Sequence, residues 1–275
     1  MLFVICVEYL SRLLKSLEGK FRFKFHPKCD ELKITHLAFA DDLMLFSKGD
    51  VVSVNYLMDC LKEFSQCSGF KEGEFPFKYL GVPLLSSKLN AARYRPLIDQ
   101  IAGLFKGWPG HTLTYAGRLE IINSIIQGIE CFWLAIFPIP GNVLNQVIKL
   151  CRVFLWGGRR KALVAWREIY KPKQGGGLGV VDFKTWNRAL LTKALWNVQA
   201  KKDSLWTKWI HQFYLKEVEI WYVVANKDDS PVVKSLVEIK DQLVLNSGSV
   251  AAAIENMERM GSGSHTLYDF WREKS

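Results

Sequence analysis

The first quarter of the chain carries hydrophobic positions at both helical and strand-like spacing. Apolar side chains recur every three or four positions over residues 2–17, which predicts an amphipathic helix. Phe21, Phe23 and Phe25 alternate with basic residues, the pattern of a half-buried strand. A second helical stripe covers residues 54–64. We therefore expect helices that pack against a small sheet in this region.

A β-hairpin is predicted between these two helices. The apolar runs 34–40 and 43–46 are separated only by Asp41 and Asp42. A gap of two residues between strand-like runs is typical of a hairpin, although Asp-Asp is a poorer turn than Asp-Gly. This spacing places Asp41 and Asp42 at the tip of the hairpin.

Helical spacing dominates beyond a loop at residues 69–90, which is rich in glycine, proline and serine and holds a short extended piece at 79–83. Five further stripes predict helices with one face in the core, at 94–105, 119–133, 143–155, 186–198 and 206–213. The pattern weakens after Trp221, and residues 226–231 predict a turn. These elements predict an α+β fold that is mostly helical after the hairpin.

Several residue types could serve either packing or ligand binding. Residues 175–179 are glycine-rich but lack the Gly-Lys-Ser/Thr ending of a phosphate-binding loop, so they predict a flexible turn. Tryptophan can stack on nucleic-acid bases, yet helical spacing favours core packing for those in the later helices. These tryptophans are Trp186, Trp196, Trp206 and Trp209.

The net charge of +10 is concentrated in the middle of the chain. Residues 71–173 hold 15 Lys and Arg against 6 Asp and Glu, a net charge of +9, whereas residues 1–70 are neutral. Such an asymmetry favours a polyanionic partner, although a solvated basic face has the same composition. The densest basic run is Arg159-Arg160-Lys161.

Other classes of protein are disfavoured by composition and spacing. The six cysteines include no C-x-x-C pair and the five histidines show no metal-ligand spacing, so we expect free thiols and no zinc site. No run is apolar enough for a transmembrane helix, and residues 1–10 lack the flanks of a signal peptide. We therefore expect an intracellular protein, cytoplasmic or nuclear, with no membrane partner.

Asp41 and Asp42 are the candidates for metal chemistry. Carboxylates between buried strands are held rigidly, and hard divalent cations prefer oxygen ligands of this kind. Asp228-Asp229 is a second such pair, but it lies in a polar turn without strand-like flanks, and we assign it no chemistry. An ordinary acidic turn remains an alternative for the first pair as well.

The segment Phe39-Ala40-Asp41-Asp42 resembles the F-A-D-D box of non-LTR (LINE-type) reverse transcriptases of plant retrotransposons. Further stretches resemble the same family in the same order: residues 2–10 the palm helix, 77–84 the K-Y-L-G stretch, 108–124 the thumb, 156–179 the connection, and 260–266 the segment before a Cys/His-rich region. The resemblance implies a palm remnant over 1–75 with the F-A-D-D hairpin, a helical thumb-like region over 76–160, and a connection region and tail over 161–275.

The resemblance also implies RNA-directed DNA polymerisation with two Mg²⁺ ions, held in part by Asp41 and Asp42. The family's upstream metal-binding Asp and its Q-G-x-x-x-S-P motif are absent, so we expect an inactive chain that does not hold Mg²⁺ stably. The alternatives are a non-catalytic nucleic-acid-binding module and an incomplete gene model of a full polymerase. The expected partner is RNA or DNA, bound without sequence specificity and without a small-molecule cofactor. The expected contacts are Lys106, Arg118, Arg159, Arg160 and Lys161.

Overall fold

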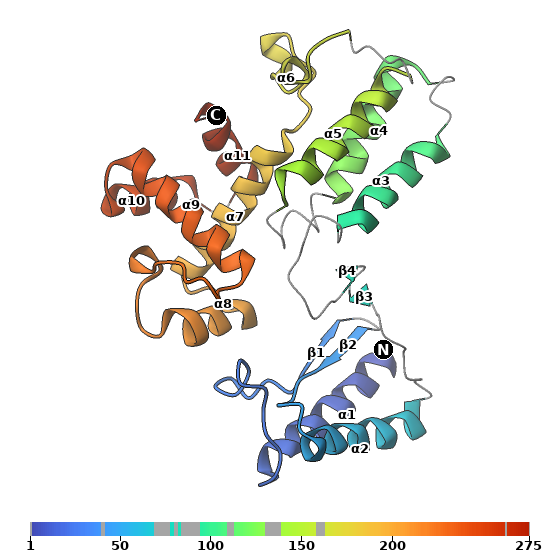
Figure 1. Ribbon diagram of the computed structural model, residues 1–275, viewed down its shortest axis with the longest axis vertical. Coiled ribbons are helices and arrows are strands. Elements are labelled where there is room, and N and C mark those ends of the chain that lie inside the picture. Colours follow the sequence, from blue (N-terminus) through green and yellow to red (C-terminus); the bar gives the residue numbers. More distant parts are fainter. Residues whose placement is uncertain are drawn as a thin grey trace. The chain divides into compact units, whose positions relative to one another are not determined.

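The computed structural model describes residues 2–39, 42–68, 78–79, 82–83, 94–108, 113–129, 139–157, 163–261 and 263–274. It divides into two compact units (Figure 1). The first comprises Met1–Lys88 with Lys208–Lys216, and the second comprises Leu89–Thr207 with Glu217–Ser275. Helices predominate and the sheets are small, which agrees with an α+β fold. The three-region division at residues 75 and 160 stays a prediction.

Two helices form the core of the first unit. Helix α1 (Leu2–Ser16) continues into a 3₁₀ turn (Leu17–Gly19) and packs against α2 (Val51–Ser68). Both follow from the apolar spacing in the sequence, because that spacing places large side chains on one face of each helix. The buried cluster between them comprises Leu10, Leu14, Leu17, Phe23, Leu57 and Phe64.

The predicted hairpin is present beside these helices. Strand β1 (His36–Phe39) pairs antiparallel with β2 (Asp42–Leu45), with His36 opposite Leu45 and Phe39 opposite Asp42. A second, shorter antiparallel pair joins β3 (Lys78–Tyr79) to β4 (Val82–Pro83).

The strand predicted over residues 21–25 is wrong. This segment is a turn followed by irregular chain, and the Phe23 amide donates to the Lys20 carbonyl at 3.0 Å. The Phe21 side chain is fully exposed, whereas Phe23 is buried and stacks edge-on against Phe25. Alternation arises here because two phenylalanines join the core of α1 and α2, and no strand pairing is needed to produce it.

A distant segment completes the first unit. Residues 211–215 form a single π-helical turn (His211–Leu215), and the Trp209 ring stacks on Phe213. The Trp209 indole N–H donates to the Lys28 carbonyl at 2.7 Å, and the Lys28 ammonium lies 5.4 Å from the centre of the Phe213 ring. Residues separated by 181 positions therefore share one compact unit.

Three helices form one part of the second unit: α3 (Arg95–Gly107), α4 (Tyr115–Ile129) and α5 (Gly141–Leu155). Helix α5 packs against both of the others, as Figure 1 shows. The predicted apolar stripes supply the contact: the buried side chains include Leu97, Ile101, Phe105, Ile122, Val143, Val147, Cys151 and Phe154. We refer to these helices as the three-helix bundle.

The glycine-rich segment after the bundle is a closely packed turn. It follows the short helix α6 (Trp166–Ile169) and a 3₁₀ turn (Lys173–Gly175). The Gly177 amide donates to the Pro172 carbonyl at 3.1 Å, and the Gly179 amide to the Lys171 carbonyl at 2.9 Å. The segment is a turn, as predicted, but backbone hydrogen bonds hold it closely, so it is not the flexible turn expected from the sequence.

Another part of the second unit is built on α7 (Phe183–Gln199), which packs against α9 (Pro231–Ser247) and α11 (Ser264–Glu273). The Trp271 indole N–H donates to the Thr192 hydroxyl at 2.8 Å inside this packing. Helix α10 (Val250–Met260) packs on α9, and α8 (Leu205–Ile210) follows α7 in the chain. Asp182, Ser230 and Ser249 cap α7, α9 and α10 by accepting a backbone N–H.

Candidate nucleic-acid interface

Basic side chains from two helices come together at one end of the three-helix bundle. The Phe105 and Phe154 rings stack with their centres 4.4 Å apart, so the C-terminal ends of α3 and α5 lie side by side. Lys106 directly follows Phe105, and Arg152 precedes Phe154 by two residues. Both basic side chains are exposed. The sequence-predicted residue Lys106 therefore has a basic neighbour, Arg152, that sequence spacing did not identify.

Arg118 comes from the third helix and has a structural contact at the same end. It lies in the first turn of α4, and its guanidinium donates to the Leu155 carbonyl at the end of α5, at 3.1 Å. The same guanidinium lies where a side chain at Gly157 would stand. Tyr115 precedes it, with its ring centre 5.4 Å from that of Trp156. Arg118 therefore ties the start of α4 to the end of α5.

The helix ends affect the electrostatics of this surface. The C-terminal ends of α3 and α5 carry partial negative charge, which Lys106, Arg118 and Arg152 offset, whereas the start of α4 is partly positive. Acidic residues are sparse among the described parts of these helices: Asp99 pairs with Arg95 in the first turns of α3, and Glu120 lies in α4. The bundle end is therefore basic.

Arg159, Arg160 and Lys161 lie outside the described residues. They follow Gly157, the last described residue after α5, by two to four positions. Their role as phosphate contacts stays a prediction.

The acidic pair predicted for metal binding is only partly described. Asp41 lies outside the described residues, and Asp42 is the half-buried first residue of β2. Within the described ranges, no three His, Cys, Asp or Glu side chains come together as a possible metal site. The described residues therefore do not fit an Mg²⁺ centre, and we derive no metal-dependent step. The cysteines Cys6, Cys29, Cys60 and Cys151 are free thiols, as expected.

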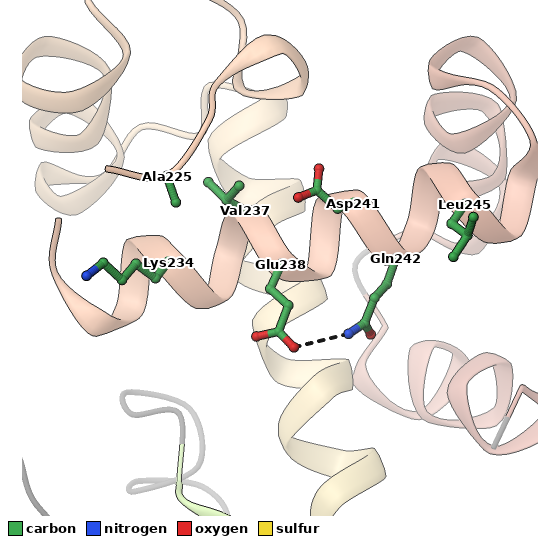
Figure 2. A pocket seen from close by; sticks show the side chains of 7 residues that line it. All are labelled: Ala225, Lys234, Val237, Glu238, Asp241, Gln242 and Leu245. Carbon is green, nitrogen blue, oxygen red and sulfur yellow. Dashed lines mark hydrogen bonds between the residues drawn. The ribbon is translucent and has the colours of Figure 1, made fainter. Parts of the chain in front are cut away.

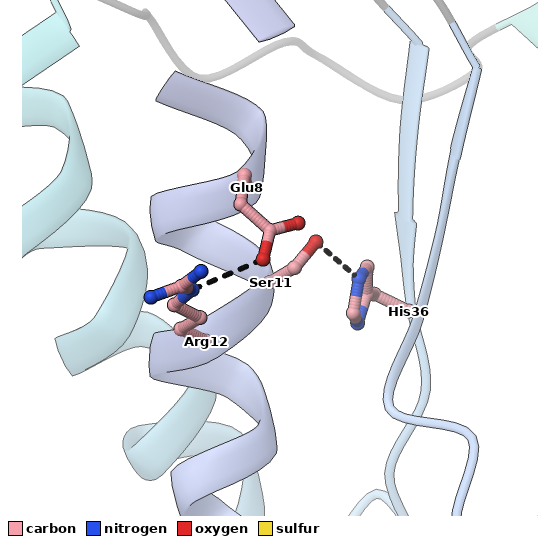
Figure 3. Close-up of polar contacts among 4 residues, drawn as sticks. All are labelled: Glu8, Ser11, Arg12 and His36. Atoms are coloured by element: carbon pink, nitrogen blue, oxygen red, sulfur yellow. Dashed lines mark hydrogen bonds and ion pairs between the residues drawn. The ribbon is translucent and has the colours of Figure 1, made fainter. Parts of the chain in front are cut away.

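A serine–histidine contact joins α1 to β1 (Figure 3). The Ser11 hydroxyl lies 2.9 Å from His36 Nε2, and the Thr35 hydroxyl lies 3.0 Å from Nδ1. Burial, and secondarily the charge of Lys15, lowers the pKa of the His36 imidazole. A general base that activates a serine is usually oriented by a carboxylate, but here a hydroxyl holds the second ring nitrogen. We therefore interpret His36 as a link between α1 and the hairpin.

A shallow groove runs along α9 beside Ala225 (Figure 2). Lys240 holds the segment before α9 against this helix. Its buried ammonium donates to the Val223 carbonyl at 2.8 Å and pairs with Asp241 at 2.8 Å. Glu238 accepts a hydrogen bond from the Gln242 amide on the lower side of α9 in this view. The groove combines apolar and mixed-charge side chains along a single helix face, and we assign it no chemistry.

Comparison with known proteins finds a relative that matches part of the chain. A curated protein of Arabidopsis thaliana named "Putative ribonuclease H protein" is 31% identical over 137 residues, which cover 48% of this chain and 22% of that protein. The chain thus spans about a fifth of the length of this relative. No family model matches the sequence. No helix in the described part of the chain combines the length and apolarity needed to span a bilayer.

This match corrects the resemblance drawn from the sequence. The relative is named for ribonuclease H, so the identification as a LINE-type reverse transcriptase fragment, and with it the function of RNA-directed DNA polymerisation, is wrong. The labels palm, thumb and connection lose their basis for the same reason. The F-A-D-D motif is short, and the register of the hairpin pairs Asp42 with Phe39 within the strands, so Asp42 does not lie at the tip as the sequence predicted. The Arabidopsis match does not by itself indicate a plant source.

Proposed function

We propose that this chain binds RNA or DNA through the phosphate backbone, without sequence specificity, at the basic end of the three-helix bundle. The observation that carries the proposal is the convergence of Lys106 and Arg152, both exposed, where α3 and α5 end together. Phosphate contacts require only accessible Lys and Arg side chains and carry no sequence information.

Two further observations support a polyanionic ligand. The segment 71–173, which contains the bundle, carries a net charge of +9 out of the chain's +10. The name of the Arabidopsis relative refers to ribonuclease H, an activity on nucleic acid. The sequence predicts Arg159, Arg160 and Lys161 as further contacts, and reversing all three to Glu is expected to weaken binding to every sequence about equally.

The proposal is tested by fluorescence anisotropy with labelled RNA and DNA strands over a range of salt concentrations. We expect dissociation constants of about 10⁻⁴ to 10⁻⁶ M at physiological salt, rising steeply with salt because counterions are released on binding. The double variant Lys106→Glu/Arg152→Glu is expected to weaken binding to all strands and to lower the slope of log K against log salt by about two.

The matched control is Lys62→Glu/Lys184→Glu, which reverses exposed lysines on α2 and α7. Each reversal removes two units of charge, so both double variants fall from +10 to +6. An effect of overall charge alone would weaken binding equally in the two variants, and that result would contradict the proposed interface. Absence of binding even at low salt would contradict the function itself.

A further inference from the structure

The basic end of the bundle also exposes aromatic surface. Trp108 follows the last residue of α3 in extended conformation, and 51% of its surface is accessible. Tyr115, the first residue of α4, is 38% accessible. Both lie close to the proposed phosphate contacts, because Lys106 is two residues from Trp108 and the Tyr115 ring packs against Trp156 at the end of α5.

The exposure of Trp108 contrasts with that of three other aromatic residues at this end. Phe105, Phe154 and Trp156 are all more than 90% buried and hold α3, α4 and α5 together. Burial of an indole removes a large apolar surface from water, so core packing would favour covering Trp108 as well. A half-exposed indole beside basic side chains is the combination on which unpaired bases stack in proteins that bind single strands.

We propose that the bundle end binds single-stranded RNA or DNA, with an unpaired base stacked on Trp108 and the flanking phosphates on Lys106 and Arg152. This inference rests on the proposed function and adds the class of strand. A paired base has its faces covered by its neighbours in the helix, so a duplex offers phosphates to this surface but no free base. Tyr115 supplies a second aromatic surface at the same end.

The test compares two single strands with equal numbers of phosphates, a short oligothymidylate and an abasic strand of the same length, by fluorescence anisotropy at fixed salt. We expect the oligothymidylate to bind roughly 5- to 100-fold more tightly, because each stacked base strengthens binding by about this factor. Trp108→Ala is expected to remove most of the preference by weakening binding of the oligothymidylate, whereas the abasic strand has no base to lose from Trp108. Trp108→Phe, which keeps an aromatic face, is expected to retain much of the preference.

Trp206→Ala is the matched control, because Trp206 is 37% accessible on α8, outside the bundle. Its preference for the base-bearing strand is expected to equal that of the wild type. Equal affinity of the wild type for both strands, or an unchanged preference in Trp108→Ala, would overturn the stacking inference while leaving phosphate binding intact. Loss of binding to both strands in the wild type would instead contradict the proposed function, and the inference with it.

Discussion

Arg118 and Arg152 have different roles at the same end of the three-helix bundle: Arg118 has a structural contact, whereas Arg152 is exposed. The Arg118 guanidinium donates to the Leu155 carbonyl, at a helix end where carbonyl groups lack intrahelical partners. We expect Arg118→Ala to lower the free energy of unfolding by about 1–2 kcal/mol, because a part-buried carbonyl loses its donor. Urea-induced unfolding monitored by circular dichroism measures this loss.

Arg152→Ala serves as the comparison, since this residue is exposed in the last turn of α5. A surface substitution of this kind changes stability by only about 0.5 kcal/mol or less. The same variant is expected to weaken nucleic-acid binding. Equal losses of stability in the two variants would show that the Arg118 contact with α5 is not a stabilising one.

We expect the free energy of unfolding to depend on pH through His36. Burial lowers the pKa of its imidazole below the ordinary value of 6.5, with a smaller contribution from the charge of Lys15. The unfolded chain therefore takes up a proton at a pH where folded His36 remains neutral, so stability is greatest above pH 6.5 and falls as pH drops toward the folded pKa.

A two-part measurement checks this expectation. NMR is expected to show that the His36 ring resonances titrate at a lower pH than those of a histidine in the unfolded chain. The loss of unfolding free energy on acidification through this window is expected to be smaller in His36→Gln, which keeps polar atoms but does not titrate. A His36 resonance that titrates at or above the ordinary value would contradict the effect of burial.

At the scale of an element, the glycine-rich turn depends on the close approach of two backbone segments. A methyl group on Gly177 would overlap the Lys171 carbonyl, and neither backbone segment can move without breaking the hydrogen bonds of the turn. We expect Gly177→Ala to destabilise the protein by about 2–3 kcal/mol, the cost of overpacking at a rigid site.

Gly175→Ala is the control for this prediction. It lies two residues earlier, and a methyl group there would have no heavy atom within 4 Å. Its thermal midpoint is expected to stay close to that of the wild type, whereas Gly177→Ala is expected to unfold several degrees earlier. If the two variants melt together, the turn is not held as closely as its hydrogen bonds indicate.

At the scale of the whole molecule, the chain leaves the first compact unit after residue 88 and contributes to it again at Lys208–Lys216. Trp209 fixes this return through its hydrogen bond to the Lys28 carbonyl. We expect Trp209→Ala to speed amide hydrogen exchange over residues 26–34, with little change in α7, α9 and α11. Local opening is the expected result, because the helical core of α1 and α2 does not contain Trp209.

Trp206→Ala provides the comparison here too, since it removes an indole only three residues away that makes no part of the first unit. Exchange over residues 26–34 is expected to match that of the wild type. Unchanged exchange in Trp209→Ala, measured by mass spectrometry of peptides, would contradict the structural role of the returning segment.

The candidate interface was only partly predictable from sequence. Lys106 and the excess positive charge were identified from the chain alone, because charge counts require no structure. Arg152 and Trp108 were not identified as interface residues. The sequence did place Arg152 in the last turn of one predicted helix and Trp108 shortly after the end of another. Only the stacking of Phe105 on Phe154 brings these two helix ends together.

The sequence by itself determined the helices α1 to α5, α7 and the hairpin, because their hydrophobic period is a local property of each segment. It failed over residues 21–25, where alternation came from core packing, and after Trp221, where α9, α10 and α11 follow a weak pattern. Only the tertiary structure decided these elements, together with the pairing of Trp209 with Lys28 and of Arg118 with α5. Such contacts join residues far apart in the chain, so no local period encodes them.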